Sequence, residues 1–171
     1  MNKKCTKCTN DAIWTDYTNK NMCKTHFLEQ IERRIRKHLR VNKLINIKKE
    51  YYLIEDENKK YKITKYFLKK IFEDRIKITK NKNAPQIISK TMDDDAQNLL
   101  DYFLQTNIYA SDEINLLSVI ADEEAKTIAK ILKFDIKITP KKHLELTKKD
   151  PQLLFSMQKS KKFIDSRKNN S

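Results

Sequence analysis

The sequence of 171 residues contains no glycine. Average usage of about 7% predicts roughly 12 glycines in a chain of this length. Their absence excludes phosphate-binding loops of the G-x-G-x-x-G or Walker kind, because those loops need backbone without a Cβ close to the phosphate. Turns with a positive φ must then use Asn or Asp, and we expect them at Asn19, Asn21, Asn81, Asn83 and Asn107.

Long apolar stretches are also absent. No run approaches the roughly 18 to 20 residues that cross a bilayer, and the polar N-terminus MNKKCTKCTN has no apolar signal-peptide core. We therefore expect a cytoplasmic protein without membrane contact. After a metal module of about 30 residues, the remaining length suffices for one modest hydrophobic core.

Cysteine is scarce, and all three cysteines lie in the first 23 residues. They form the pattern Cys5-x2-Cys8, followed by 14 residues and then Cys23-x2-His26, which is the spacing of a zinc site. An odd number of cysteines with a matching histidine favours thiolate ligation over disulfides in a reducing compartment. Four ligands complete a tetrahedron and leave no position for a substrate, so we predict one structural Zn²⁺. The competing interpretation is three ordinary buried thiols beside a helix-capping histidine.

The charge is strongly positive and unevenly distributed. Lys and Arg number 37 against 23 Asp and Glu, a net charge of +14. Residues 1–50 carry 13 basic and five acidic side chains, whereas residues 91–125 carry nine acidic and no basic ones. A basic N-terminal part favours a polyanionic partner such as RNA, although a bias toward lysine throughout the chain would also raise the net charge.

A basic amphipathic helix is predicted directly after the cysteine-rich segment. Apolar residues recur every four positions at Phe27, Ile31, Ile35 and Leu39, which predicts a helix over residues 27–46. Its other face carries five cations that we predict to bind RNA: Arg33, Arg34, Arg36, Lys37 and Arg40. Arginine is favoured here over the lysine that the chain otherwise prefers, and its planar fork suits phosphate oxygens. The alternative is a solvated helix face.

The remainder of the chain predicts an α/β fold. We expect strands at 51–54, 76–78 and 87–89, and helices around 63–71, over 93–106 and over 121–133. The predicted organisation is a zinc finger at 1–27, a basic linking helix at 28–49, an α/β domain with a helical C-terminal part at 50–165 and a disordered tail at 166–171. A short hairpin over residues 12–17 is expected to bring the two halves of the metal site together.

Few polar residues suggest catalysis. Asp93, Asp94 and Asp95 stand where a predicted helix begins, and acids there complement the positive end of the helix and cap it. His38 and His143 lie among basic residues without a Cys, Ser or paired acid placed to form a triad or metal site.

The opening segment Met22-Cys23-Lys24-Thr25-His26-Phe27, which runs into a basic helix, resembles the N-terminal zinc finger of the TtuA-type tRNA 2-thiouridine synthetases. Members of that family have a PP-loop ATP pyrophosphatase domain that adenylates a tRNA uridine, a middle C-x-x-C with a third cysteine, and a second zinc finger. The resemblance implies a reduced PP-loop-like, Rossmann-like domain and a connection to cytosolic tRNA thiolation.

The chain departs from that family where the chemistry occurs. The loop S-G-G-x-D-S is replaced by residues 56–61, Asp-Glu-Asn-Lys-Lys-Tyr. The later motif G-H-N-x-D-D, followed by E-A-Q, keeps only its two acids and A-Q, so the resemblance makes Asp93 and Asp94 a vestigial nucleotide site. The middle cysteines and the second finger have no counterpart. Weak similarity resumes at 121–125 and 150–156.

These observations predict a non-catalytic relative that binds tRNA or another structured RNA, as an accessory subunit beside an intact thiolase subunit. One alternative is a ribosome-associated or protein-associated zinc module whose acidic stretch, residues 93–124, docks on a protein. A second alternative is an enzyme subunit that completes a shared ATP site with a partner, in which Asp93 or Asp94 binds magnesium.

Overall fold

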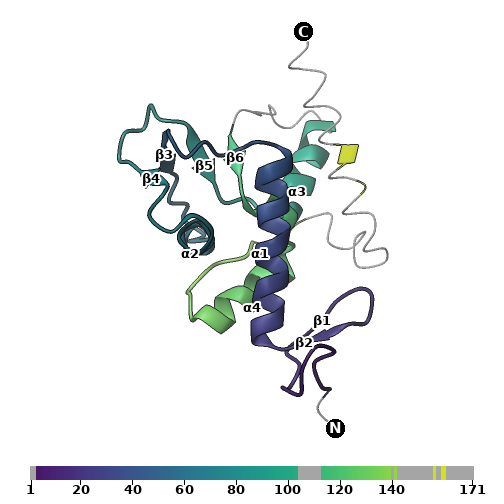
Figure 1. The fold of residues 1–171 in the computed structure, drawn as a ribbon. Coiled ribbons are helices and arrows are strands. Elements are labelled where there is room, and N and C mark those ends of the chain that lie inside the picture. The colour runs from purple at the N-terminus through teal and green to yellow at the C-terminus, as the bar shows by residue number, and fades with distance from the viewer. Residues whose placement is uncertain (1–2, 104–112, 140, 142–155, 157–158, 161–171) are drawn as a thin grey trace.

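The computed structural model describes residues 3–103, 113–139, 141, 156 and 159–160. A four-stranded parallel sheet of order β4-β3-β5-β6 forms the centre of the fold (Figure 1). The strands are short: β3 is Glu50–Leu53, β4 is Lys77–Ile78, β5 is Gln86–Ile88 and β6 is Ile114–Asn115. Strand β4 lies on one side of β3, and the next strand, β5, lies on the other side of β3. The direction in which strands are added to the sheet therefore reverses between β3 and β5.

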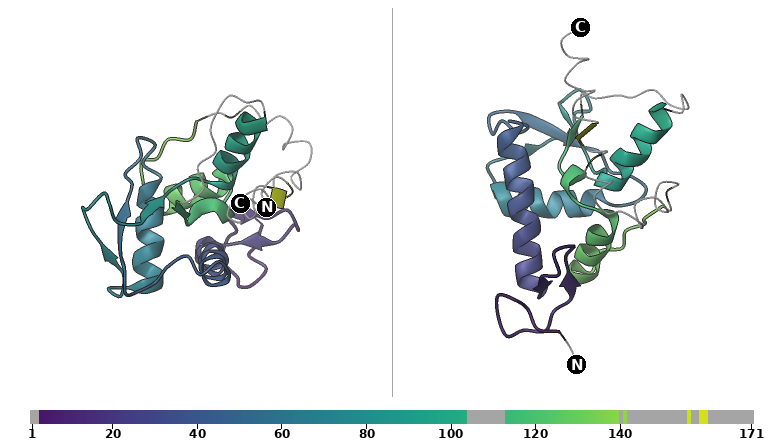
Figure 2. Two further views of the ribbon diagram at one scale, coloured as in Figure 1. Left: turned by 90° about the horizontal axis from the view of Figure 1, so that it is seen from above. Right: turned by 90° about the vertical axis from the view of Figure 1, so that its right-hand side faces the viewer.

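Helices surround this sheet. They are α1 (Lys24–Val41), α2 (Tyr61–Phe72), α3 (Met92–Phe103) and α4 (Asp122–Leu132), with a 3₁₀ turn η1 (Leu117–Val119) after β6. Figures 1 and 2 show α1 running from a small hairpin at the N-terminal end of the molecule to the sheet. That hairpin consists of β1 (Trp14–Thr15) and β2 (Asn21–Met22).

One hydrophobic core joins α1, α2, α4 and the sheet. The buried side chains of α1 are Phe27, Ile31, Ile35 and Leu39, the four that the sequence pattern predicts. Burial of such side chains contributes about 1.5–3 kcal/mol each, which is why this helix is stable despite its charge. Among the described residues, no helix is both long enough and apolar enough to cross a membrane.

The predicted α/β class is confirmed, and most element positions agree within one or two residues. Helix α1 is the exception, since it begins three residues earlier and ends five residues earlier than predicted. It ends at Val41, with Asn42 as its C-cap, because Lys43 takes a positive φ of 49° and the Leu44 amide bonds back to the Leu39 carbonyl at 3.1 Å. Strand β6 was not predicted. The predicted helical part beyond Pro140 and the tail at 166–171 lie outside the described residues, apart from residues 141, 156, 159 and 160.

The prediction that Asn and Asp supply the positive-φ positions is largely wrong. Of the candidates only Asn19 has a positive φ, at 59°. Asn107 lies outside the described residues, and the other described positive-φ residues are Lys43, Lys59, Glu73 and Lys133. Three of these stand at or just beyond a helix C-terminus, where the chain must turn to satisfy carbonyl groups whichever residue is there.

Candidate functional site

The four predicted metal ligands converge. The Cys8 and Cys23 sulfurs are 3.6 Å apart, and the His26 Nδ1 lies 3.3 Å from the Cys5 sulfur and 3.4 Å from the Cys23 sulfur. All four ligand atoms lie within 4.8 Å of one another. A tetrahedral ion with Zn–S bonds of about 2.3 Å places its sulfurs roughly 3.8 Å apart, so the spacing and the donor types fit Zn²⁺. The sulfurs are too far apart for a disulfide, which needs about 2.05 Å.

Local structure holds these ligands in place. Cys5 and Cys8 lie in a turn closed by the Cys5 amide, which donates to the Asn10 carbonyl at 2.9 Å. Cys23 directly precedes the first residue of α1, and His26 lies in its first turn. A hairpin lies between the two halves of the site, as predicted, but it spans residues 14–22 rather than 12–17. Its Trp14 ring packs on Phe27 of α1 with the ring centroids 5.3 Å apart.

The three thiols of the cluster differ in their pKa values. Although burial opposes it, hydrogen bonds from the Lys7 and Cys23 amides and from His26 lower the pKa of the Cys5 thiol to about 6. A hydrogen bond from the His26 amide lowers the pKa of the Cys23 thiol, whereas, against a hydrogen bond from the Asn10 amide that lowers it, burial and the neighbouring sulfurs of Cys23 and Cys5 raise the pKa of the Cys8 thiol. A thiolate is the form that binds a metal ion. The cluster thus has the geometry and the donor atoms of a metal-binding site.

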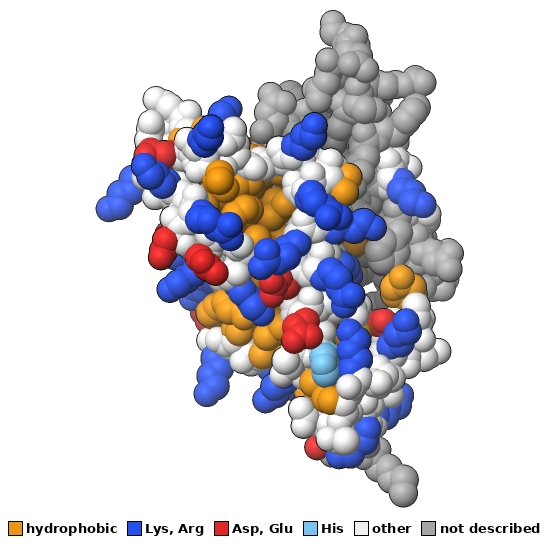
Figure 3. Space-filling model, viewed as in Figure 1, with side chains coloured by type: hydrophobic (Ala, Val, Ile, Leu, Met, Phe, Trp, Pro, Cys, Tyr) orange, Lys and Arg blue, Asp and Glu red, His pale blue; other side chains and the backbone are white. Residues whose placement is uncertain are grey.

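The predicted RNA-binding cations separate into two groups. Arg33, Arg36, Lys37 and Arg40 follow the i, i+3, i+4, i+7 spacing of one helix face and line an open groove of about 700 Å³ between α1 and α2. Figure 3 shows Lys and Arg side chains surrounding hydrophobic side chains on this side of the molecule. Arg34 points elsewhere, and its guanidinium pairs with Glu124 of α4 at 2.6 Å.

A second cavity, of about 560 Å³, lies at the carboxyl ends of β3 and β5, where the strand order reverses. In open α/β sheets this is the usual place for a ligand. Its lining includes the loop after β3, the end of β5 and the first half of α3, with Lys60, Ser89, Asp94 and Lys141 among the contributors. The side chains of Lys60 and Lys141 are each only 6% exposed to solvent.

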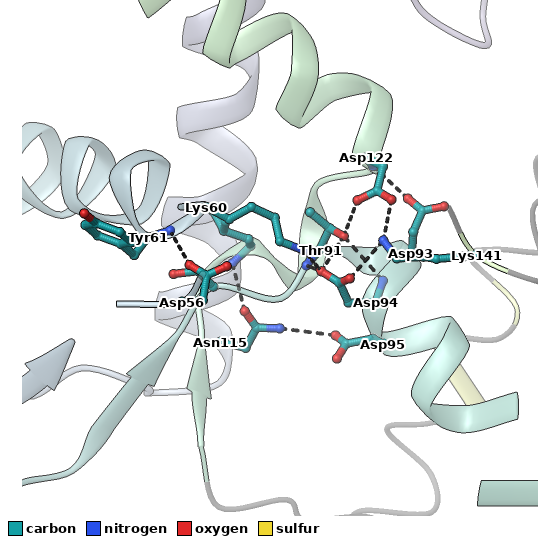
Figure 4. Close-up of polar contacts among 12 residues, drawn as sticks. Asp56, Lys60, Tyr61, Thr91, Asp93, Asp94, Asp95, Asn115, Asp122 and Lys141 are labelled. Carbon is teal, nitrogen blue, oxygen red and sulfur yellow. Dashed lines mark hydrogen bonds and ion pairs between the residues drawn. The ribbon is translucent and has the colours of Figure 1, made fainter. Parts of the chain in front are cut away.

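Asp94 is held from three sides in this cavity (Figure 4). Its Oδ2 accepts hydrogen bonds from the Thr91 amide at 2.7 Å and the Thr91 hydroxyl at 2.9 Å, and pairs with the Lys60 ammonium. Its Oδ1 pairs with Lys141 at 2.9 Å. Although burial opposes it, these cations lower the pKa of the Asp94 carboxyl to about 2. The contacts with Thr91 form a capping box at the start of α3, so the predicted capping role is confirmed for Asp94.

Asp93 turns away from this cavity. Its Oδ2 accepts the Asp122 amide at 2.7 Å, at the first residue of α4. Asp122 in turn accepts the Thr91 hydroxyl at 2.6 Å and pairs with Lys141. Asp95, also buried, accepts an Asn115 amide hydrogen at 3.3 Å (Figure 4). The two acids predicted as one vestigial site therefore have different surroundings.

Sequence reasoning missed the two lysines that meet Asp94. Nothing marks Lys60 or Lys141 among 37 basic residues, because their partners lie 34 and 47 positions away along the chain. The spacing Thr91-x-x-Asp94 is a readable capping signal. His38, which was not predicted to act chemically, hydrogen-bonds the Asn115 carbonyl at 3.0 Å and the Ser118 hydroxyl at 3.1 Å, and so ties α1 to the segment after β6.

Comparison with known proteins gives a structural match. No family model matches the chain, and no curated protein matches it by sequence. Among solved structures it is similar to the U34-tRNA thiolase NcsA from Methanococcus maripaludis, determined with its [4Fe-4S] cluster, with a TM-score of 0.74. The superposition covers 95% of this chain and 87% of that chain, with 15% sequence identity. The chain thus has the PP-loop-like fold of that thiolase, as the resemblance of its opening segment implies.

Proposed function

We propose that this chain is a non-catalytic RNA-binding protein with one structural zinc ion, which acts beside a tRNA-thiolating enzyme. The observation that carries the proposal is the cationic groove between α1 and α2. Arg33, Lys37 and Arg40 are exposed there, and no ion pair joins them to any part of the chain that the structure describes. Unpaired cations side by side repel one another, and phosphates relieve that repulsion.

The fold supports tRNA as the class of RNA. The similar structure is named as a U34-tRNA thiolase, and the metal cluster of this chain lies at the opposite end of α1 from Arg40. Closed zinc modules stabilise small segments that cannot bury a core alone. Here the metal would fix the hairpin against the start of the helix that carries the cations.

The sheet-edge cavity supports a loss of ATP chemistry. A pyrophosphate would need free donors, yet Lys60 and Lys141 are already paired with Asp94. The loop after β3 has a Cβ at every position, and its one left-handed residue is Lys59. All three cysteines are also accounted for by the metal cluster, so none is left to hold an iron–sulfur cluster.

The two alternatives have less support. A protein-docking role for the acidic stretch needs exposed carboxylates, but of its described acids only Glu123 is exposed and four are buried, namely Asp93, Asp95, Asp122 and Glu124. A magnesium site at Asp94 would have to displace two lysine ammonium groups. Each alternative also predicts a measurable result.

The test of RNA binding compares two triple variants with the same change in net charge. Arg33→Glu, Arg36→Glu and Arg40→Glu together should abolish binding of unfractionated tRNA in a fluorescence anisotropy titration. Lys126→Glu, Lys130→Glu and Lys133→Glu, exposed on α4 or at its C-terminal end, should leave most of the affinity. Equal losses in the two variants would mean that only net charge matters, and would overturn the proposed site.

The test of catalysis is calorimetric titration with ATP and Mg²⁺, for the chain alone and for the chain with a co-purified thiolase subunit. We expect no saturable binding by the chain alone and no gain of binding when it joins the partner. Saturable binding by the isolated chain, or cleavage of ATP at the α-phosphate, would refute the non-catalytic assignment.

A further inference from the structure

The groove between α1 and α2 has two chemically different parts. Its rim consists of the cations Arg33, Arg36, Lys37 and Arg40. Its floor is apolar and is made of Leu39 from α1, Ile45 from the following loop, and Ile71 and Phe72 from the end of α2. The floor residues come from three segments that meet only in the folded chain, so the pocket is a product of the tertiary structure.

The charged residues that line the groove are all cations. Among the described residues no Asp or Glu belongs to the lining, although Glu73 and Asp74 follow Phe72 directly in the sequence. The nearest carboxylate on α1 is Glu32, which is already shared between Arg36 at 2.8 Å and Lys70 at 3.0 Å. Arg36 is therefore partly neutralised, while the other three rim cations remain available. The groove thus complements an anion with more than one negative charge along its length.

The floor includes a partly buried aromatic ring, that of Phe72. Leu39 and Ile71 are buried, but Phe72 and Ile45 are only partly covered and belong to the margin of the core. Phe72 is the last residue of α2, and the Arg75 amide and Nε both bond to its carbonyl, at 3.0 and 3.2 Å. These bonds fix the backbone on which the ring is carried. A partly exposed apolar surface beside cations complements a ligand that has both an apolar surface and negative charge.

A rigid RNA duplex uses only the rim. The phosphates of a duplex lie on its outside and its bases are stacked inside, so the apolar floor would stay empty. A single strand offers both chemistries at once, because an unstacked base can lie on an aromatic or apolar surface while the flanking phosphates meet cations. We propose that the α1–α2 groove binds an unpaired stretch of RNA, with one base on the floor formed by Ile45 and Phe72.

This inference rests on the proposed RNA binding and specifies its ligand. The rim cations hold the phosphates on either side of the inserted base, and the floor holds the base by stacking and apolar contact. Since every base has a flat face, the site selects unpaired nucleotides without strong selection among the four bases.

Three fluorescently labelled ligands separate the contributions: an unstructured oligoribonucleotide of about eight residues, a strand of the same length made of abasic nucleotides, and a blunt duplex. Anisotropy titrations should show the base-containing strand bound at least about fivefold more tightly than the abasic strand or the duplex. Phe72→Leu should weaken binding of the base-containing strand by about fivefold or more and leave the other two ligands unchanged. Phe72→Tyr should retain the affinity.

Two controls make the result decisive. Tyr17→Leu removes an aromatic ring that is 74% exposed on the zinc hairpin, away from the groove, and should change none of the three affinities. Thermal unfolding of Phe72→Leu shows whether the variant is folded, and if it is not, Ile45→Ala, which removes the other partly covered floor side chain, should show the same selective loss for the base-containing strand. Equal affinity for strand and duplex, with no effect of Phe72→Leu, would overturn the inference but leave RNA binding intact. No binding of any RNA by the unaltered protein would overturn both.

Discussion

Asp94 and Lys141 form a 2.9 Å ion pair inside the cavity at the carboxyl edge of the sheet, and Lys60 meets the same carboxylate from the other side. The carboxylate thus occupies the position between two cations that an anionic ligand would otherwise need. At the same time it completes the capping box with Thr91 that starts α3. One side chain therefore stabilises a helix end and pairs with two buried lysines.

The first prediction concerns acid stability. The Asp94 carboxyl has an ordinary pKa of 3.8, lowered to about 2 in the folded chain by Lys60 and Lys141. A depressed pKa means that the carboxylate contributes stability above pH 4, and that this contribution is lost as pH falls through 2. We expect Asp94→Asn to lower the free energy of unfolding by roughly 2 kcal/mol at pH 7. The difference between variant and parent should shrink steadily below pH 4.

Urea unfolding followed by circular dichroism at pH 7, 4 and 3 measures this effect. Asp135→Asn is the matched control, because Asp135 also pairs with a lysine, Lys59, but its side chain is 72% exposed. Solvent screens such exposed pairs, and the control should unfold like the parent at every pH. A difference between Asp94→Asn and the parent that stays constant down to pH 3 would contradict the assigned pKa.

The second prediction concerns the metal. Trp14 is the one tryptophan of the chain, and it packs on Phe27 at the junction of the hairpin and α1. Purified protein should contain one zinc ion per chain by elemental analysis. Removal by a strong chelator should shift the Trp14 emission to longer wavelength, because the hairpin cannot stay folded without its metal. Zinc added back should restore the original spectrum.

Ligand variants give the same readout. Cys8→Ser should lower the zinc content and show the shifted emission before any chelator is added. Thr9→Ala, the adjacent residue that is not a ligand, should bind zinc like the parent. Full zinc occupancy in Cys8→Ser would mean that the cluster is not the metal site.

The third prediction uses salt dependence to count phosphate contacts. For a single strand the slope of log K against log salt falls by about 0.7 for each phosphate contact removed. Lys37→Ala should therefore bind RNA with a slope that is smaller by roughly that amount. Lys126→Ala, whose lysine pairs with Glu123 on the exposed side of α4, should keep the parental slope. An unchanged slope for Lys37→Ala would remove Lys37 from the interface.

The fourth prediction separates Arg34 from its neighbours. Its ion pair with Glu124 links α1 to α4, and the two side chains are only 29% and 11% exposed. We expect Arg34→Met to weaken the fold, and a double-mutant cycle with Glu124→Gln to give a coupling of about 1 to 2 kcal/mol. RNA affinity measured on the folded Arg34→Met variant should stay within about twofold of the parent. A loss as large as that of Arg33→Ala would return Arg34 to the RNA-binding group.

The contrast between Arg34 and Arg33 shows what sequence could and could not predict. The periodicity of α1 identifies its buried face because those residues recur within a single helix. The residues of the metal cluster are equally predictable from sequence, since the members of each pair are separated by only two residues. The direction in which each cation points depends on where α2 and α4 pack, and no local pattern carries that information.

Contacts between distant segments explain the other misses. Lys60 and Lys141 meet at Asp94 only through the tertiary fold, and β6 consists of two residues that pair with β5. The sequence predicted the cations of the groove, because they lie on one helix. It did not predict the apolar floor, because Phe72 comes from a different helix. Three positive-φ residues were missed because they lie where helices end. The backbone must turn at such a position whichever residue occupies it.

The fifth prediction follows from this last point. Lys133, at the C-terminus of α4, has φ 56° and ψ 40°, and its amide bonds to the Ala129 carbonyl. A side chain with a Cβ in this left-handed conformation costs about 1 kcal/mol, which glycine avoids. Lys133→Gly should therefore raise the free energy of unfolding by about 0.5 to 1 kcal/mol, although glycine makes the unfolded chain more flexible.

The same substitution three residues earlier provides the control. Lys130 is exposed within α4 and also removes one positive charge when replaced, but its backbone is helical. Lys130→Gly should destabilise the protein by about 1 kcal/mol, the usual cost of glycine inside a helix. Urea unfolding of the two variants should thus give shifts of opposite sign. If both variants were destabilised, the left-handed geometry at Lys133 would carry no strain for glycine to relieve, and the chain would lose nothing at this turn by lacking glycine.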